Sequence, residues 1–170
     1  MCALVGIVML FAAFTSALVV RKGIGNDWVR TDLPRLLWLN SAVLLASSVT
    51  LELARRSLAA RVARRFHIWW YVTTALGLAF IAGQLQAWRE LAARGVYLAT
   101  NPSSSFYYLL TAAHGVHLLG GIAALFYVAL RVGRITLAPE RSPAVGATAI
   151  YWHFMDGLWI YIFLLMLARL

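Results

Sequence analysis

Five long apolar stretches, separated by short polar loops, constrain the fold of this chain more than any other feature. They cover residues 3–20, 36–53, 68–88, 106–130 and 146–167. A helix needs about 20 predominantly apolar residues to cross the hydrocarbon core of a bilayer. Short loops also force consecutive helices to run antiparallel. The sequence therefore predicts an all-α, polytopic membrane protein, with residues 1–170 forming a single domain that is a bundle of five antiparallel transmembrane helices.

Composition supports this class. The chain is 62% hydrophobic and 12% charged, and its mean hydropathy is +0.78, which is too apolar for a water-soluble domain. The net charge of +9 comes mostly from arginines in the loops between the apolar stretches. Topology and anionic lipid headgroups explain arginines at these positions, so we expect no nucleic-acid partner.

The loop charges give only a weak indication of the orientation in the membrane, because the loops on the two sides of the membrane carry nearly equal numbers of Lys and Arg. The loop from residue 55 to residue 65 is distinctive, since it holds five arginines and no acid. The positive-inside rule places such a loop in the cytoplasm. We therefore expect a multi-pass protein of the inner (cytoplasmic) membrane, with its N-terminus in the cytoplasm and its C-terminus outside. Arg21 and Lys22 follow the first span and no basic residue precedes it, which predicts a retained helix rather than a secretory signal.

Histidine and aspartate side chains occur inside two of the apolar stretches, where unpaired polar groups are costly. His114 and His117 are three residues apart in the fourth stretch, and His153 and Asp156 repeat that spacing in the fifth. Residues three apart share a helix face. The pattern fits a metal or bis-histidine haem site. It fits better a structural network of hydrogen bonds between helices, in which Asp156 orients a histidine ring.

Glu52 and the single cysteine also favour a structural role over a catalytic or cofactor-binding one. Glu52 precedes Arg55 and Arg56 by about one helical turn, which favours ion pairs over a proton-carrying role. Cys2 is the only cysteine, which excludes CxxCH haem attachment and a paired-thiolate copper site. Nucleophile elbows and phosphate-binding glycine loops are absent from the sequence. We therefore expect no catalytic residue, metal or cofactor in this chain, and a structural polar network of His114, His117, His153, Asp156 and Glu52.

A basic cluster lies beside the aromatic start of the third stretch. It consists of Arg55, Arg56, Arg61, Arg64 and Arg65, next to Trp69. Each arginine near an anionic membrane surface contributes about 1 kcal/mol of binding. The cluster is therefore a candidate phospholipid site, and the equally weighted alternative is that it only sets topology.

Three segments of the chain resemble subunit III of the haem-copper respiratory oxidases, the cytochrome c oxidase subunit 3 family. They are LLWLNSAVLLASSVTLELARR at residues 36–56, SSFYYLLTAAHGVHLLGG at residues 104–121 and YWHFMDGLWIYIFL at residues 151–164. They follow one another in the family's order and spacing. The resemblance implies the five-helix form of a family whose longer members have seven helices. The intramembrane glutamate of many relatives is missing here, and Met9 lies near its expected position.

The resemblance also implies a function. It predicts an accessory subunit without redox centres, packed against oxidase subunit I, which holds haem and copper, and against other oxidase subunits. Such a subunit would bind phospholipids and support proton uptake by its partner. One alternative is the equivalent subunit of a quinol oxidase or nitric oxide reductase system. Another is a free-standing haem b electron carrier with His117 and His153 as ligands.

Overall fold

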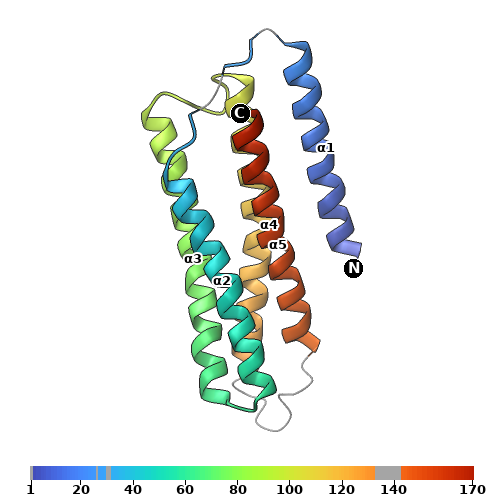
Figure 1. Ribbon diagram of the computed structural model, residues 1–170, viewed down its shortest axis with the longest axis vertical. Coiled ribbons are helices and arrows are strands. Elements are labelled where there is room, and N and C mark those ends of the chain that lie inside the picture. Colours follow the sequence, from blue (N-terminus) through green and yellow to red (C-terminus); the bar gives the residue numbers. More distant parts are fainter. Residues whose placement is uncertain (1, 26, 30–31, 133–142) are drawn as a thin grey trace.

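The computed structural model describes residues 2–25, 27–29, 32–132 and 143–170, in which every regular element is an α-helix. The helices are α1 (Cys2–Ile24), α2 (Leu36–Ala59), α3 (Ala63–Ala93), α4 (Pro102–Val132) and α5 (Pro143–Arg169) (Figure 1). All five are long and apolar enough to cross a membrane. The prediction of an all-α, multi-pass membrane protein with five spans is therefore confirmed.

Each helix extends beyond the apolar stretch that predicted it. The largest difference is in α3, which covers 31 residues, whereas its apolar stretch covers residues 68–88. Hydropathy marks only the part of a helix that lies in hydrocarbon. The backbone hydrogen-bond ladder continues through the polar and basic residues that lie in the headgroup layer, because the chain still has to satisfy its backbone groups there.

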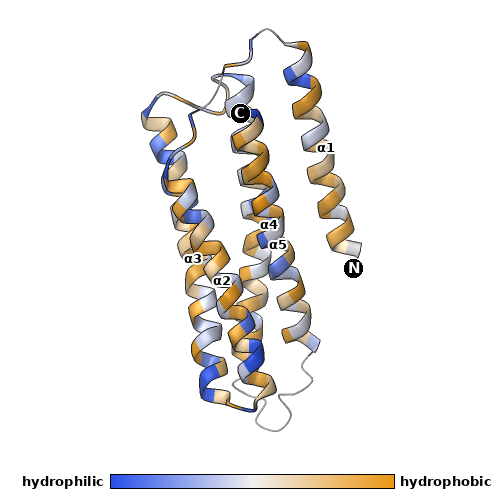
Figure 2. Cartoon of the chain, viewed as in Figure 1, coloured by the Kyte–Doolittle hydropathy of each residue, from blue (hydrophilic) through white to orange (hydrophobic). Residues whose placement is uncertain are grey.

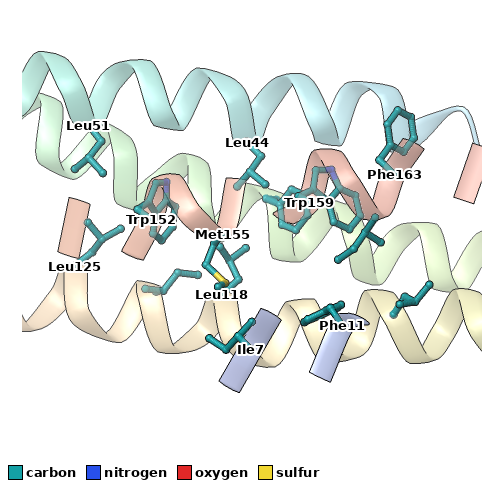
Figure 3. Packing of buried hydrophobic residues seen from close by; sticks show 14 of the residues in the cluster. Ile7, Phe11, Leu44, Leu51, Leu118, Leu125, Trp152, Met155, Trp159 and Phe163 are labelled. Carbon is teal, nitrogen blue, oxygen red and sulfur yellow. The ribbon is translucent and has the colours of Figure 1, made fainter. Parts of the chain in front are cut away.

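Helices α2 to α5 lie side by side and alternate in direction, and the C-terminus lies at the same end as the α3–α4 connection (Figure 1). Their shared core is built around large side chains of α5. Trp152, Met155 and Trp159 are fully buried and pack with Leu44 of α2 (Figure 3). Hydrophobic attraction between helices is weak in lipid, so such close packing and interhelical hydrogen bonds hold a membrane bundle together.

Glycines allow the helices to approach closely at two levels of the bundle. A Cβ atom built on Gly77 of α3 would lie 2.6 Å from Cη2 of Trp152, and one built on Gly121 of α4 would lie 3.1 Å from Cε3 of the same indole. At Gly83, a Cβ would overlap the side-chain amide of Asn40, which donates a hydrogen bond of 3.0 Å to the Phe80 carbonyl. Trp152 therefore fits between α3 and α4 because both helices have glycine there.

The turns after α2 and α3 have the same hydrogen-bond pattern. After α2, Val62 N donates to the Ser57 carbonyl and Arg61 N to the Leu58 carbonyl, both at 3.0 Å. After α3, Val96 and Gly95 make the equivalent bonds to Leu91 and Ala92, also at 3.0 Å. This is the Schellman motif, whose penultimate residue is left-handed. Gly95 has φ 77° and Arg61 has φ 60°, so a non-glycine residue occupies the left-handed position of the α2–α3 turn.

Helix α1 stands to one side of the other four (Figure 1) and is attached to α4 and α5. Its buried side chains are Ile7, Phe11 and Leu18. The Thr15 and Tyr161 hydroxyls lie 2.8 Å apart, and Lys22 Nζ donates to the Arg169 carbonyl at 2.6 Å, capping the C-terminal end of α5. Just beyond α1, a hydrogen bond of 2.6 Å from Arg21 holds the pKa of the Asp27 carboxyl below its ordinary value.

Candidate functional site

The two histidines of α4 have separate surroundings. The His114 ring is fully buried between Phe80 of α3 and Trp159 of α5, at centroid distances of 5.9 and 5.1 Å. Neither of its ring nitrogens has a hydrogen-bond partner among the described residues. The His117 Nδ1–H donates to the Ala113 carbonyl of its own helix at 2.6 Å, and its ring contacts Phe11 of α1. Although one turn apart, the two side chains therefore contact different helices.

His153 and Asp156 lie about one turn apart on α5 and differ in their surroundings. His153 Nδ1 and the Ser48 hydroxyl lie 2.5 Å apart, and the tautomer decides which of them donates. The Asp156 side chain is buried, with only 4% of the residue exposed, and neither carboxyl oxygen has a hydrogen-bond partner among the described residues.

The expected pairing of Asp156 with a histidine ring is not formed among the described residues. The Nδ1 atom of His153 is hydrogen-bonded to the Ser48 hydroxyl, and the Nδ1 atom of His117 is hydrogen-bonded to the Ala113 carbonyl of its own helix. A spacing of three residues places two side chains on one helix face, but it does not decide which group on the neighbouring helix each one meets. That choice depends on the register between α2 and α5.

Three hydrogen bonds define this register. The indole N–H of Trp159 donates to the Ser41 hydroxyl at 2.9 Å, and that of Trp152 donates to the Ser47 hydroxyl at 3.0 Å. The third is the contact between His153 and Ser48. All three join α2 and α5. Trp159 meets Ser41, and about two turns earlier on α5 Trp152 and His153 meet Ser47 and Ser48, so between these two levels the residue numbers fall on α5 as they rise on α2, as antiparallel helices require. These serines were not among the predicted site residues. The available signal was three hydroxyls inside an apolar stretch.

Glu52 lies on the outer side of this interface. It accepts from Arg55 Nη1 at 3.0 Å and from Arg56 Nε at 3.2 Å, which is the ion pairing that the spacing favours. Glu52, Arg55 and Arg56 line a pocket of about 330 Å³, and Val145 and Gly146 of the first turn of α5 line it too. The pocket lies at the α2–α3 end of the bundle.

The basic cluster divides between two pockets. Arg56 and Arg65 line a second pocket of about 650 Å³ together with Trp69, and the apolar residues of its lining include Leu53 and Ile68. Arg55 lies instead in the pocket of Glu52. Arg61 and Arg64 are exposed at the same turn. Hydrophilic residues gather at the end of α2 and the start of α3 (Figure 2).

This arrangement can hold helices together and can present positive charge above an apolar groove. Within the described part of the chain, no group of three or more His, Cys, Asp or Glu side chains is placed to hold a metal ion. His114, His117 and His153 point to three different sets of neighbours.

Comparisons with known proteins identify the family. The family model described as cytochrome c oxidase subunit III matches residues 2–168. A probable cytochrome c oxidase subunit 3 of Mycobacterium bovis is 33% identical over 161 residues, covering 91% of this chain and 76% of that protein. The cytochrome c oxidase subunit 3 of Thermostichus vulcanus is 26% identical over 162 residues, covering 93% of this chain and 79% of that protein. With a match along almost its whole length, this five-helix chain belongs to the cytochrome c oxidase subunit III family.

Proposed function

We propose that this chain is the accessory, non-redox subunit of a terminal oxidase in the cytoplasmic membrane, where it stabilises the catalytic subunit. That partner, oxidase subunit I, would hold haem and copper, reduce oxygen and pump protons. The observation that carries the proposal is the family match over residues 2–168. Hydrogen bonds between helices, such as His153 with Ser48 and Trp159 with Ser41, also support a structural role.

The test is purification of the complex from native membranes in mild detergent through a tag on this chain. Intact mass spectrometry should find a haem-copper catalytic subunit with it, and the haem absorption should disappear when this chain is separated. A copper-binding subunit II in the complex would assign cytochrome c as electron donor, and a subunit II without copper would assign quinol. A chain that purifies alone with stoichiometric haem b, lost on replacing His117 or His153, would overturn the proposal in favour of an electron carrier.

The proposed orientation has the α2–α3 turn in the cytoplasm and Leu170 outside. It is supported by the acid-free arginine cluster, all of which lies at one end of the bundle. The positive-inside rule counts arginines in short loops near the ends of spans, and this turn satisfies both conditions.

The pocket of Arg56, Arg65 and Trp69 is our proposed phospholipid site. A guanidinium pair at the rim would bind the phosphate, the indole would lie at the level of the headgroups, and Leu53 and Ile68 would contact the start of an acyl chain. The pocket is open rather than enclosed, as an acyl chain that continues into the bilayer requires.

Native mass spectrometry of the purified complex tests this site. Replacing Arg56 and Arg65 by glutamine should remove at least one retained phospholipid, because each arginine contributes about 1 kcal/mol. The control variant replaces Arg35 and Arg89, two exposed arginines toward the other end of the bundle, and should keep the wild-type lipids. Equal lipid retention in both variants would mean that the cluster only sets topology.

A further inference from the structure

The two pockets at the end of α2, the Glu52 pocket and the Trp69 pocket, have Arg56 in common. From this part of the helix, the Glu52 pocket is lined by Glu52, Arg55, Arg56, Leu58 and Ala59, and the Trp69 pocket by Leu53, Arg56 and Ser57. Successive residues are rotated by about 100° around a helix. The two sets therefore lie on neighbouring sides of α2, with Arg56 between them, and a ligand with two polar groups a short distance apart can reach both pockets.

The two pockets differ in charge. The lining of the Trp69 pocket includes Arg56 and Arg65 and no acid, whereas the Glu52 pocket contains a carboxylate. Each oxygen of that carboxylate accepts one hydrogen bond, from Arg55 Nη1 at 3.0 Å and from Arg56 Nε at 3.2 Å. An ionised carboxylate has about four acceptor positions, and the Glu52 side chain is 37% exposed. It can therefore accept further hydrogen bonds from a ligand.

The Arg56 guanidinium links the two pockets chemically. Its Nε–H donates to Glu52, and a guanidinium carries further N–H groups on its Nη atoms. The Arg56 side chain is 75% exposed, so a ligand can reach these groups. An anion bound through Nη is separated from the Glu52 carboxylate by this one guanidinium.

We propose that the phospholipid site selects a headgroup with a primary ammonium, as in phosphatidylethanolamine. The phosphate binds Arg56 and Arg65 in the Trp69 pocket, and the ammonium donates to the carboxylate in the Glu52 pocket. The short ethanolamine link spans the guanidinium of Arg56, which contacts both groups. The inference rests on the phospholipid site of the proposed function and names the class of lipid that this site takes.

The chemistry of the headgroups explains the choice. A choline headgroup has the same charge but no N–H, so it cannot donate to Glu52. A glycerol headgroup donates only neutral hydroxyls, and charge-assisted hydrogen bonds are roughly twice as strong. A second phosphate in the Glu52 pocket would meet the carboxylate, and like charges repel. A primary ammonium satisfies the acid of this pocket while the arginines of the Trp69 pocket hold the phosphate.

Native mass spectrometry of the purified complex tests the selectivity with added lipids of matched acyl chains. The lipids are phosphatidylethanolamine, its N-methyl and N,N-dimethyl derivatives, phosphatidylcholine and phosphatidylglycerol. Subtracting the lipid bound by the Arg56→Gln, Arg65→Gln complex isolates this site from others in the complex. Retention at the site should fall with each added methyl group. Phosphatidylethanolamine should exceed phosphatidylcholine about threefold or more, as for a partly exposed ion pair.

Glu52→Gln removes the negative charge and should lower the retention of phosphatidylethanolamine to that of phosphatidylcholine. Glu90→Gln is the matched control, because Glu90 pairs with Arg94 one turn further along α3 as Glu52 pairs with Arg56 along α2. This control should keep the wild-type preference. If the Glu52→Gln complex is not recovered, the methylation series on the wild-type complex decides.

Each possible failure has its own signature. Equal retention of phosphatidylethanolamine and phosphatidylcholine by the wild-type complex, or a preference unchanged in Glu52→Gln, would overturn the inference and leave the phospholipid site standing. Stronger retention of phosphatidylglycerol would overturn it in favour of an anionic lipid. If replacing Arg56 and Arg65 removes no lipid, the site of the proposed function fails and the inference fails with it.

Discussion

The three histidines of α4 and α5 take different kinds of partner, although all lie in apolar parts of spans. His153 uses a hydroxyl across a helix interface, His117 uses a carbonyl of its own helix, and His114 is enclosed by aromatic rings. Removing one partner of a buried hydrogen bond costs more than the bond itself contributes, because the other group loses its solvation. The effect of a substitution therefore depends on which bond exists, and the sequence spacing does not reveal this.

His153→Ala should weaken assembly more than Asp156→Ala. The first substitution breaks the contact with Ser48, at a cost of about 1–3 kcal/mol, whereas the second removes a carboxyl that has no hydrogen bond to lose among the described residues. The measurements are the amount of subunit retained in the purified complex and the initial oxygen turnover per catalytic haem. We expect low retention for His153→Ala and near-normal initial turnover in complexes that keep the subunit.

His67→Ala, at the start of α3, is the control and should retain the wild-type amount. Equal losses for the two α5 variants would show that the Asp156 carboxyl has a hydrogen-bond partner in the complex. Full retention with initial turnover lost would place these residues in the transfer of protons or electrons that the oxidase reaction uses.

At the scale of helices, α5 packs closely against α3 and α4 where a glycine of those helices faces the large ring of Trp152. Gly77 and Gly121 border Trp152, whereas Gly115 and Gly157 have no atom within 4 Å of the position that a Cβ would take. Glycine in a helix is less favourable than alanine by roughly 0.5–1 kcal/mol, so it persists best where its missing side chain makes room. Trp152 also donates to Ser47, which prevents the indole from moving freely.

Gly77→Ala should destabilise the bundle by about 1–3 kcal/mol, the usual cost of overpacking a core. Gly157→Ala is the matched control and should leave stability unchanged or raise it by about 0.5–1 kcal/mol. Thermal unfolding of both variants in detergent, followed by circular dichroism, compares them. A Gly77→Ala protein as stable as the Gly157→Ala protein would mean that Trp152 can shift without loss.

At the scale of the whole molecule, all helices align with one axis, but α1 joins the others through fewer contacts. Its attachments are Phe11 against His117, Thr15 with Tyr161, and Lys22 on the last turn of α5. The end of the bundle with the α2–α3 turn carries the arginine cluster and both pockets. The opposite end carries the C-terminus and the α3–α4 connection (Figure 1).

Cysteine labelling in intact cells should place these two ends on opposite sides of the membrane. In a Cys2→Ser background, Ala60→Cys should resist a membrane-impermeant thiol reagent until the cells are permeabilised. Leu98→Cys, exposed at the other end, should react at once. The reason is the excess of arginine without acid beside Ala60. Prompt labelling at position 60 with protection at position 98 would reverse the orientation.

The sequence by itself determined the number of spans, their order and the family, because apolar length and motif order are properties of consecutive residues. It also determined the ion pairs of Glu52, since both partners lie on the same helix within one turn. Only the tertiary structure decided that Ser48 is the partner of His153, that Arg56 and Arg65 share a pocket with Trp69, and that the Asp156 carboxyl has no hydrogen-bond partner among the described residues. These contacts join different helices or different turns, and their identity depends on register and rotation, which packing in three dimensions sets.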